Sequence, residues 1–398
     1  MKRILSVFLL SLLLFYCCGF SVFASVDEDE YYNQEDVLTD INSLEINAKS
    51  AILMDADTGY VIYAKNASTG LPPASVTKVM TLLLVAEAID LGKINLSDNV
   101  LVSANAASKG GSQIFLKEGE SFTVEELLKS TVIASANDAA VALAELVAGT
   151  ESAFVDKMNR KAEELGMKNT HFENATGLDD SVTSHYISAY DIALMSRELI
   201  KYDVITRYSN VWQDSIRNGE FVLTNTNRLV RYYDGCTGLK TGSTSKAGFC
   251  VSATAKRGNM HLIAVVMGAE TRDERNDAAR AMLDFGFSNF ELYLDSDTEL
   301  EKIEVLHGVS DYVTAYSRGF SKLLDKGNGK LVEKEYLIPY TLKAPLTKGD
   351  VVGKIVYRLD GKEIGESEIY IDESVGKVGI FELFARLIKA IFTGDGSF

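Results

Sequence analysis

The sequence predicts an α/β fold built on an antiparallel sheet with a helical subdomain, followed by a small all-β domain and a C-terminal amphipathic helix. Strand patterns near both ends of residues 47–290 flank a long series of helical patterns. The last strands of this stretch are joined by short turns, which only antiparallel neighbours allow. Short alternating segments separated by turn residues then cover residues 298–375.

Residues 1–24 have the composition of a secretory signal. A basic start precedes an apolar run, and Val22 and Ala24 fit the residues that signal peptidase recognises. An uncleaved membrane helix is the alternative, because the run is close to the ~20 residues that span a bilayer. We expect cleavage after Ala24, and we interpret the acidic residues 25–46 as a solvated leader or linker.

The elements of the first domain follow in order. Residues 50–64 predict a β-hairpin, because two apolar segments flank a turn rich in Asp and Gly. A helix is expected from Ser75 to about Gly92. Further helical patterns cover residues 124–130, 138–147, 152–165 and 189–201, and strands at 248–254 and 261–267 precede a last helix at 274–285.

The C-terminal segment, residues 378–392, has helical periodicity. One face is apolar, and Glu382, Arg386 and Lys389 share the opposite face. The segment is too short to span a bilayer, so we expect it to lie flat on a membrane surface. A helix docked on its own β domain is the alternative.

Composition restricts the function. The formal net charge is −16, which argues against nucleic acid, because phosphates require a basic surface. No Gly-rich phosphate loop and no His-Glu-x-x-His pattern occurs, so we expect no metal and no cofactor. His185 is interpreted as structural.

Two cysteines, Cys236 and Cys250, remain after signal cleavage. They flank a predicted hairpin with its turn at residues 243–247, so Cys236 should face about position 254. The offset between the two cysteines is then ~13 Å along the strands. A disulfide needs Cα atoms within ~7 Å, so we expect two thiols.

A Ser-x-x-Lys tetrad, Ser75 to Lys78, stands at the start of a predicted helix. Positions i and i+3 share one helical face, so the lysine amine can reach the serine hydroxyl. The hydroxyl needs a base, and a lysine can serve when burial and a second cation lower its pKa. Ser243 to Lys246 also matches the tetrad, but that copy falls in the predicted hairpin turn.

Lys240-Thr241-Gly242 begins the same hairpin. A strand lysine supplies positive charge, threonine supplies a hydroxyl, and glycine allows close backbone approach. A lysine before an ordinary turn is the alternative interpretation.

Three segments match Ser-x-Asn. Ser97–Asn99 follows a helix end and is interpreted as a turn, and Ser103–Asn105 is placed in a loop. Ser135 and Asn137 precede the helix predicted at 138–147. We therefore assign the third motif to Ser135 and Asn137.

Together, the three motifs resemble those of the low-molecular-mass penicillin-binding proteins, serine-type D-alanyl-D-alanine carboxypeptidases, whose fold is the penicillin-binding/β-lactamase-like transpeptidase fold. The likeness extends from about 48 to 290 and continues more weakly into 344–350. Ala136 departs from the Asp or Gly of other branches. The segments that carry the likeness are residues 73–81, 174–178, 188–191 and 238–242.

The resemblance implies the roles in acylation. Ser75 attacks the carbonyl between two D-alanines and forms an acyl-enzyme, with Lys78 as general base. Ser135 and Lys240 relay the proton to the leaving amine. The backbone N–H groups of Ser75 and Ser243 form the oxyanion hole.

The resemblance also implies the substrate contacts. Asn137 binds the backbone amide of the substrate and Thr241 binds its terminal carboxylate, with Gly242 beside them. Arg275 takes the place of a family arginine near that carboxylate, and Arg272 is close enough in sequence to compete for this assignment.

The expected substrates are therefore peptidoglycan pentapeptide stems, and β-lactam antibiotics are expected to acylate the same serine. The expected location is secreted, attached to the outer face of the cytoplasmic membrane through the lipid-binding segment 378–392.

Two alternatives remain. A class A β-lactamase needs a Glu-x-x-x-Asn pattern between the second and third motifs, which Glu163, Glu164 and Glu173 do not provide. A non-catalytic wall-binding or β-lactam-sensing receptor could lose Lys78 or Lys240, and both are present.

Overall fold

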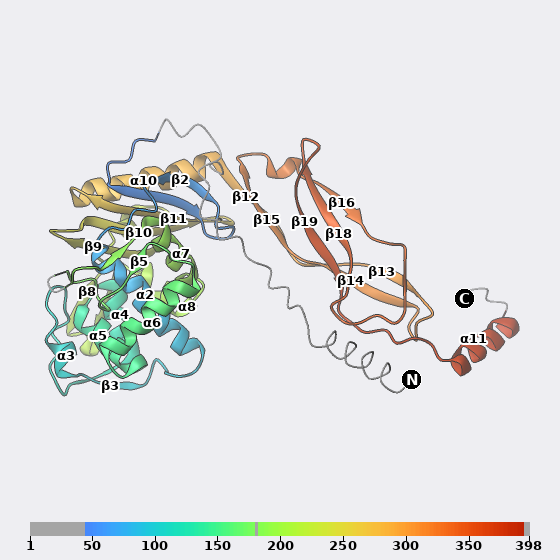
Figure 1. Cartoon of the computed structure of the whole chain (residues 1–398), viewed down its shortest axis with the longest axis horizontal. Helices are drawn as coiled ribbons and strands as arrows, with labels where there is room; N and C mark the ends of the chain where they lie inside the picture. Colours follow the sequence, from blue (N-terminus) through green and yellow to red (C-terminus); the bar gives the residue numbers. More distant parts are fainter. Residues whose placement is uncertain (1–43, 180–181, 394–398) are drawn as a thin grey trace, which may run out of the picture. The chain divides into compact units, whose positions relative to one another are not determined.

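The computed structural model describes residues 44–179 and 182–393 (Figure 1). The predicted signal, residues 1–24, and the predicted leader as far as residue 43 lie outside the described residues. All the motif residues lie within them.

The first domain is built on a five-stranded sheet in the order β2-β1-β11-β10-β9. All four strand pairs are antiparallel, as the short turns predicted. The first hairpin and the last three strands therefore form one sheet, although the whole helical region separates them in sequence. The strands are β1 (Ser50–Asp55), β2 (Val61–Lys65), β9 (Cys236–Thr244), β10 (Gly248–Arg257) and β11 (Met260–Ala269).

Helices cover both faces of this sheet (Figure 1). On one face α10 (Arg272–Asn289) packs Met282 and Leu283 into a core with Leu53 and Val266. On the other face α7 (Ala189–Leu199) contacts β1 and β11. Because both faces are covered, β1 and most of β11 are buried at every position and have no polar alternation.

The helical subdomain confirms the helices predicted from periodicity. Thr123 begins α4 with a capping box, in which the Thr123 hydroxyl and the Glu126 side chain satisfy each other's backbone N–H groups. The sequence did not predict the seven-residue helix α8 (Asp203–Ser209). The predicted helices are observed as α2 (Lys78–Asp90), α4 (Val124–Ile133), α5 (Asn137–Ala148), α6 (Glu151–Glu164) and α7.

Short elements complete the subdomain, and none was predicted, because each is too short to show periodicity. They are α3 (Ala104–Ala107), α9 (Leu229–Tyr232), β3 (Asn99–Leu101), β4 (Ser121–Thr123), β5 (Thr170–His171), β6 (Tyr186–Ile187), β7 (Gln213–Ile216) and β8 (Phe221–Thr224).

The C-terminal domain is all-β, as predicted. Its six-stranded sheet has the order β16-β18-β19-β14-β13-β17, and β12 (Phe290–Asp295) pairs with β15 (Phe320–Asp325). Strand structure thus begins at Phe290, before residue 298, where the sequence pattern predicts the start of the β domain. Tyr357 lies fully buried in this core and stacks on Phe320 at 4.0 Å between ring centroids. The other strands are β13 (Thr298–Leu306), β14 (Tyr312–Ser317), β16 (Glu333–Leu337), β17 (Thr341–Lys343), β18 (Val351–Leu359) and β19 (Lys362–Ile371).

The helix α11 (Ile380–Thr393) lies at the C-terminal end of the described chain. Phe381 and Phe384 on it are 93% and 61% exposed. Arg386 forms an ion pair with Asp311 at 2.8 Å and donates to the carbonyl of Val309. Within residues 44–179 and 182–393, no helix has the length and apolarity needed to cross a membrane.

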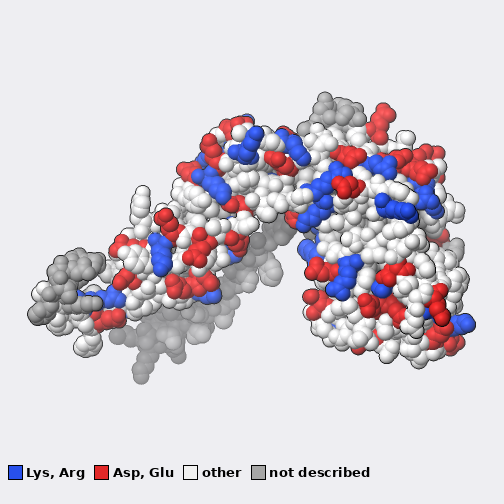
Figure 2. Space-filling model, turned by 180° about the vertical axis from the view of Figure 1, so that it is seen from behind, with Lys and Arg blue, Asp and Glu red and all other residues white. Residues whose placement is uncertain are grey.

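On the face shown in Figure 2, Lys and Arg side chains are interspersed with Asp and Glu side chains. The two cysteines are free thiols, as expected, and Cys236 faces Ala255, one position from the predicted partner.

Candidate active site

The Ser-x-x-Lys tetrad lies at a change of helix type. Residues Ala74–Thr77 form a 3-10 turn, and the α-helix α2 begins only at Lys78. In a 3-10 turn the side chains at i and i+3 eclipse each other. Lys78 Nζ therefore donates to Ser75 Oγ at 2.8 Å, and a second bond to the carbonyl of Thr176 at 2.9 Å fixes the amine.

Lys78 is fully buried, whereas Ser75 is partly exposed. Burial lowers the pKa of Lys78 well below its ordinary value, and the nearby positive charge of Lys240 lowers this pKa further. The carboxylate of Asp138 has the opposite, smaller effect on the pKa. The lowered pKa favours the neutral amine, the form that can accept the serine proton.

Lys240 lies on β9 and is 1% exposed. Its Nζ donates to the carbonyl of Thr241 at 3.1 Å. Burial lowers the pKa of Lys240 to about 7, and the positive charge of Arg275 adds to this effect. The site therefore has two buried lysines with lowered pKa values, and the charge of Lys240 disfavours a second charge on Lys78.

Gly242 brings β9 against the tetrad. A Cβ at this position would lie 2.7 Å from the backbone nitrogen of Ser75 and 2.8 Å from the carbonyl oxygen of Pro73. Only glycine allows so close an approach. The backbone of Ser243, the next residue, is consequently held near the Ser75 amide, as an oxyanion hole from these two residues requires.

Ser135 and Asn137 lie at the junction of α4 and α5. Asn137 Nδ2 donates to the carbonyl of Gly110 and its backbone N–H to that of Ser112, both at 2.7 Å. Ser135 Oγ and Asn137 Oδ1 are buried and have no hydrogen-bond partner among the described residues. Since buried polar atoms are normally paired, these two are available to a bound substrate.

The other matches to the Ser-x-Asn and Ser-x-x-Lys patterns lie outside the group of motif residues described above. Ser97 lies in a turn, as predicted. Ser103, expected in a loop, instead caps the N-terminus of α3 by accepting the N–H of Ala106 at 3.0 Å, because a short hydroxyl can satisfy an unpaired helical N–H. The second Ser-x-x-Lys match ends in the turn between β9 and β10, so Ser243 and Lys246 share no helical face.

Arg275 completes the cationic side of the site, next to Lys240. Arg275 is 3% exposed and bonds the side chain of Asn276. Burial lowers the pKa of Arg275 to about 10. Arg272 is exposed, whereas Arg275 lies close enough to Lys240 to lower its pKa. The geometry therefore favours Arg275 over Arg272 beside the motif on β9.

Residues 174–178, which carry part of the family likeness but were assigned no role from the sequence, form a loop that supports the tetrad. Gly177 has φ +81°, and a Cβ there would lie 1.8 Å from the carbonyl oxygen of Ala74. His185 accepts the N–H of Glu173 at Nδ1, so its Nε2 carries the proton and donates to Thr77 Oγ1 at 2.8 Å. Burial lowers the pKa of His185 to about 4, which keeps the ring neutral and supports the structural interpretation.

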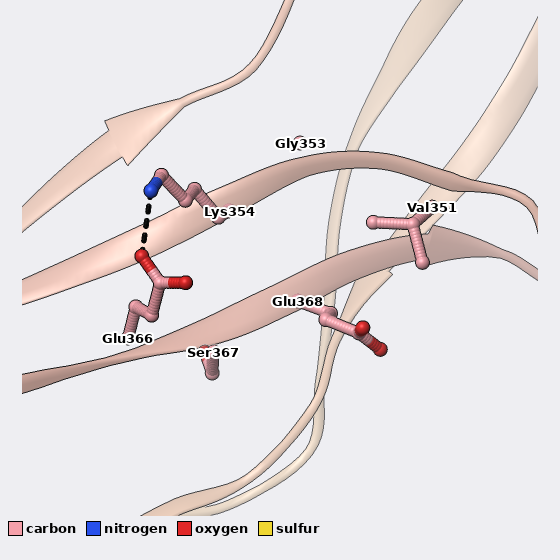
Figure 3. A pocket seen from close by; sticks show the side chains of 6 residues that line it. All are labelled: Val351, Gly353, Lys354, Glu366, Ser367 and Glu368. Atoms are coloured by element: carbon pink, nitrogen blue, oxygen red, sulfur yellow. Dashed lines mark hydrogen bonds and ion pairs between the residues drawn. The ribbon is translucent and has the colours of Figure 1, made fainter. Parts of the chain in front are cut away.

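Two surface cavities lie elsewhere. One, of about 440 Å³, lies on β18 and β19 and includes the Lys354–Glu366 ion pair at 2.6 Å (Figure 3). The other, of about 370 Å³, is lined by Arg217, Phe122 and their neighbours. Neither cavity contains a residue of the three motifs.

Comparison with known proteins agrees with this geometry. A family model described as D-alanyl-D-alanine carboxypeptidase, peptidase family S11, matches residues 36–271, and one described as the C-terminal domain of penicillin-binding protein 5 matches residues 287–377. The chain is 44% identical to the D-alanyl-D-alanine carboxypeptidase DacF of Bacillus subtilis, over 97% of this chain and 98% of the relative.

Two solved structures are similar over both domains. Penicillin-binding protein 5 of Haemophilus influenzae is 32% identical, with a TM-score of 0.73 over 85% of this chain and 100% of that one. A peptidoglycan synthesis regulatory factor, PBP3, of Streptococcus pneumoniae is also 32% identical, with a TM-score of 0.68 over 83% of this chain and 100% of that one.

Proposed function

The chain belongs to the D-alanyl-D-alanine carboxypeptidase family of serine peptidases, and on this premise we propose that Ser75 is the nucleophile that releases the terminal D-alanine from peptidoglycan stem peptides. The observation that carries the assignment is the fully buried amine of Lys78, 2.8 Å from Ser75 Oγ, with its pKa strongly lowered. Penicillins and other β-lactams acylate the same oxygen.

The proposed acylation step begins with attack of Ser75 Oγ on the carbonyl carbon of the penultimate D-alanine. The hydroxyl proton moves to the neutral amine of Lys78, and the backbone N–H groups of Ser75 and Ser243 bind the oxyanion. The C–N bond then breaks, and the leaving amine takes a proton relayed through Ser135 and Lys240. Water hydrolyses the resulting ester and regenerates Ser75.

The proposed substrate contacts use the atoms that the fold leaves available. Asn137 Nδ2 is already bonded, so Oδ1 is the atom that accepts a backbone N–H of the substrate. Thr241 donates its hydroxyl to the terminal carboxylate, and the buried charge of Arg275 attracts that carboxylate.

The enzyme belongs to the cell envelope, as do the penicillin-binding proteins of its family. We propose that residues 1–24 direct its secretion and that α11 attaches it to the outer face of the cytoplasmic membrane. The exposed Phe381 and Phe384 support attachment, because their rings can enter the headgroup region while the charged face of the helix stays in water.

Mass spectrometry tests the nucleophile. The purified enzyme should gain the mass of one penicillin on the peptide containing Ser75, and Ser75→Ala should lose this adduct while keeping its melting transition. Release of D-alanine from a pentapeptide excludes the non-catalytic receptor. An adduct that persists in Ser75→Ala contradicts the assignment.

A second experiment tests the choice of Ser-x-Asn motif. Ser135→Ala and Asn137→Ala should each slow turnover, for Ser135 by ~10²–10⁴-fold, as expected when a proton-transfer group is lost. Ser97→Ala should have no such effect. Ser103→Ala should lower stability by ~1 kcal/mol through the lost helix cap and leave acylation unchanged. Impaired acylation in the Ser97 or Ser103 variant, with normal acylation in the Ser135 and Asn137 variants, would show that the motif was assigned to the wrong segment.

A further inference from the structure

Thr226 contacts the proposed carboxylate-binding residue from outside the three motifs. Its Oγ1 accepts a hydrogen bond from the hydroxyl of Thr241 at 2.8 Å. Thr226 is partly exposed, whereas Thr241 is 5% exposed. Thr226 belongs to the segment between β8 and α9, and the roles proposed above do not include it.

Two buried asparagines hold this segment rigidly. Asn225 Nδ2 donates to the carbonyls of Ser209 and Val211, and Asn227 Nδ2 donates to the carbonyl of Gly238 on β9. The backbone N–H of Thr226 itself donates to the carbonyl of Ile133 at 3.1 Å. The hydroxyl of Thr226 is therefore held in a fixed position relative to the strand that carries Thr241.

The chemistry of two adjacent hydroxyls gives this contact a direction. Each hydroxyl has one proton to donate and can accept two bonds. A carboxylate only accepts, so when it binds, Thr241 must turn the proton that it gives to Thr226 toward the carboxylate. Thr226 can then donate to Thr241 Oγ1, and a hydroxyl that accepts a hydrogen bond becomes a stronger donor.

We propose that Thr226 is a positioning residue for carboxylate recognition, which orients the hydroxyl of Thr241 toward the free α-carboxylate of the substrate. This inference rests on the proposed function of the motif on β9. Arg228, two residues further along, lies close enough to Arg275 for its charge to act there, so the same segment also adds positive charge beside the carboxylate.

The experiment compares benzylpenicillin, which has a free carboxylate, with its methyl ester, which has none. Acylation rates of Ser75 are measured with both probes, and their ratio is the readout. Thr226→Val should reduce the acid-to-ester ratio by ~2- to 10-fold, the factor that one neutral hydrogen bond contributes. Thr226→Ser, which keeps the hydroxyl, should restore the ratio.

A control variant and a double-mutant cycle isolate the role of Thr226. Thr224→Val, at the end of β8 and two residues before Thr226, removes an exposed hydroxyl that accepts from Gln213, and its ratio should equal that of the wild type. If Thr226 acts through Thr241, the double variant Thr226→Val/Thr241→Val should show no larger loss than Thr241→Val alone. Thr226→Ala provides the same readout if the valine variant does not fold.

The outcomes separate the two proposals. An unchanged ratio, an equal loss with both probes, or additive losses in the double variant each overturn the role of Thr226. A wild-type enzyme that neither probe acylates at Ser75 overturns the proposed function, and this inference with it.

Discussion

At the scale of single residues, the site concentrates buried positive charge. Lys78, Lys240 and Arg275 are each at most 3% exposed, and each is short of negative partners. Charged groups lose hydration free energy on burial, so this arrangement costs stability. In return, burial and the charge of Lys240 favour the neutral form of the Lys78 amine, which its proposed role as a base requires.

The first prediction follows from the pKa of Lys240, about 7 in the folded enzyme against an ordinary 10.5. The cost of burying its charge is fully present below pH 7 and disappears as pH rises toward the ordinary value, where the unfolded chain also loses the proton. Lys240→Met should therefore stabilise the fold at pH 6, by on the order of 2 kcal/mol, and less at pH 9.

The measurement is the melting temperature at both pH values, which changes by ~2–4 °C for each kcal/mol in a domain of this size. Penicillin acylation of the same variant should fall strongly. Lys256→Met, at an exposed position on β10, is the control and should show neither effect. A Lys240 variant that is less stable than the wild type at pH 6 contradicts the argument.

The closeness of residues within one motif could be predicted from the sequence because it depends on short spacings, whereas their catalytic roles stay predictions. Ser75 and Lys78 are three apart, and Lys240 to Gly242 are adjacent. Thr226 and His185 could not be predicted, because their contacts to Thr241 and Thr77 join residues 15 and 108 positions apart. Nothing in their local sequence indicates which strand or turn they will meet.

At the scale of elements, a loop supports the turn that carries Ser75, the proposed nucleophile. The loop at residues 174–178 places the carbonyl of Thr176 on the Lys78 amine and packs Gly177 against Ala74. Long helices and strands could be predicted from periodicity. The 3-10 turn at Ala74–Thr77 could not, because four residues show no period that distinguishes it from the start of α2.

The second prediction tests this loop. Gly177→Ala should slow acylation at least ~10-fold and lower the melting temperature, because its Cβ would overlap the backbone of Ala74 and displace the bond from Lys78 to Thr176. Gly258→Ala is the matched control, since its φ is also positive, +59°, but nothing lies within 4 Å of its Cβ.

The control variant Gly258→Ala should lose only ~1 kcal/mol of unfolding free energy, the cost of a strained backbone, and should be acylated at the normal rate. The measurements are the rate of acylation by penicillin and the melting temperature, compared between the Gly177 and Gly258 variants. Equal behaviour of both would show that positive φ, rather than contact with the nucleophile turn, accounts for the need for glycine.

At the scale of the whole molecule, the chain combines a catalytic domain, an all-β domain and a short C-terminal helix. The fold class could be predicted from the order of strand and helix patterns. The pairing of β13 with β17, which is parallel in an otherwise antiparallel sheet, could not, because local alternation does not specify a strand's partner.

The third prediction concerns α11. Deletion of residues 377–398 from the mature chain should give an enzyme that stays active and no longer binds liposomes. Phe381→Ser/Phe384→Ser should weaken binding without truncation, since both rings are exposed and their burial in lipid supplies the driving force. Co-sedimentation with vesicles at two salt concentrations measures the effect.

Asp311→Ala, which removes the ion pair to Arg386, is the control for docking of α11 on its own domain. It should leave lipid binding unchanged or stronger. If the truncated enzyme binds vesicles as strongly as the full mature chain, attachment lies elsewhere in the protein.

The order of strands in the catalytic sheet has a consequence for synthesis and export. Strand β1 is buried at every position, and its inner neighbour is β11, so that Ser50 pairs with Met267. Roughly 200 residues must leave the ribosome before that partner exists, which takes ~10–40 s at 5–20 residues per second. During this time the hairpin of β1 and β2 presents an apolar, unpaired edge, the kind of surface that chaperones bind and that aggregates when left uncovered. Delivery of this enzyme to the envelope therefore depends on how its earliest strands are protected before β11 is made.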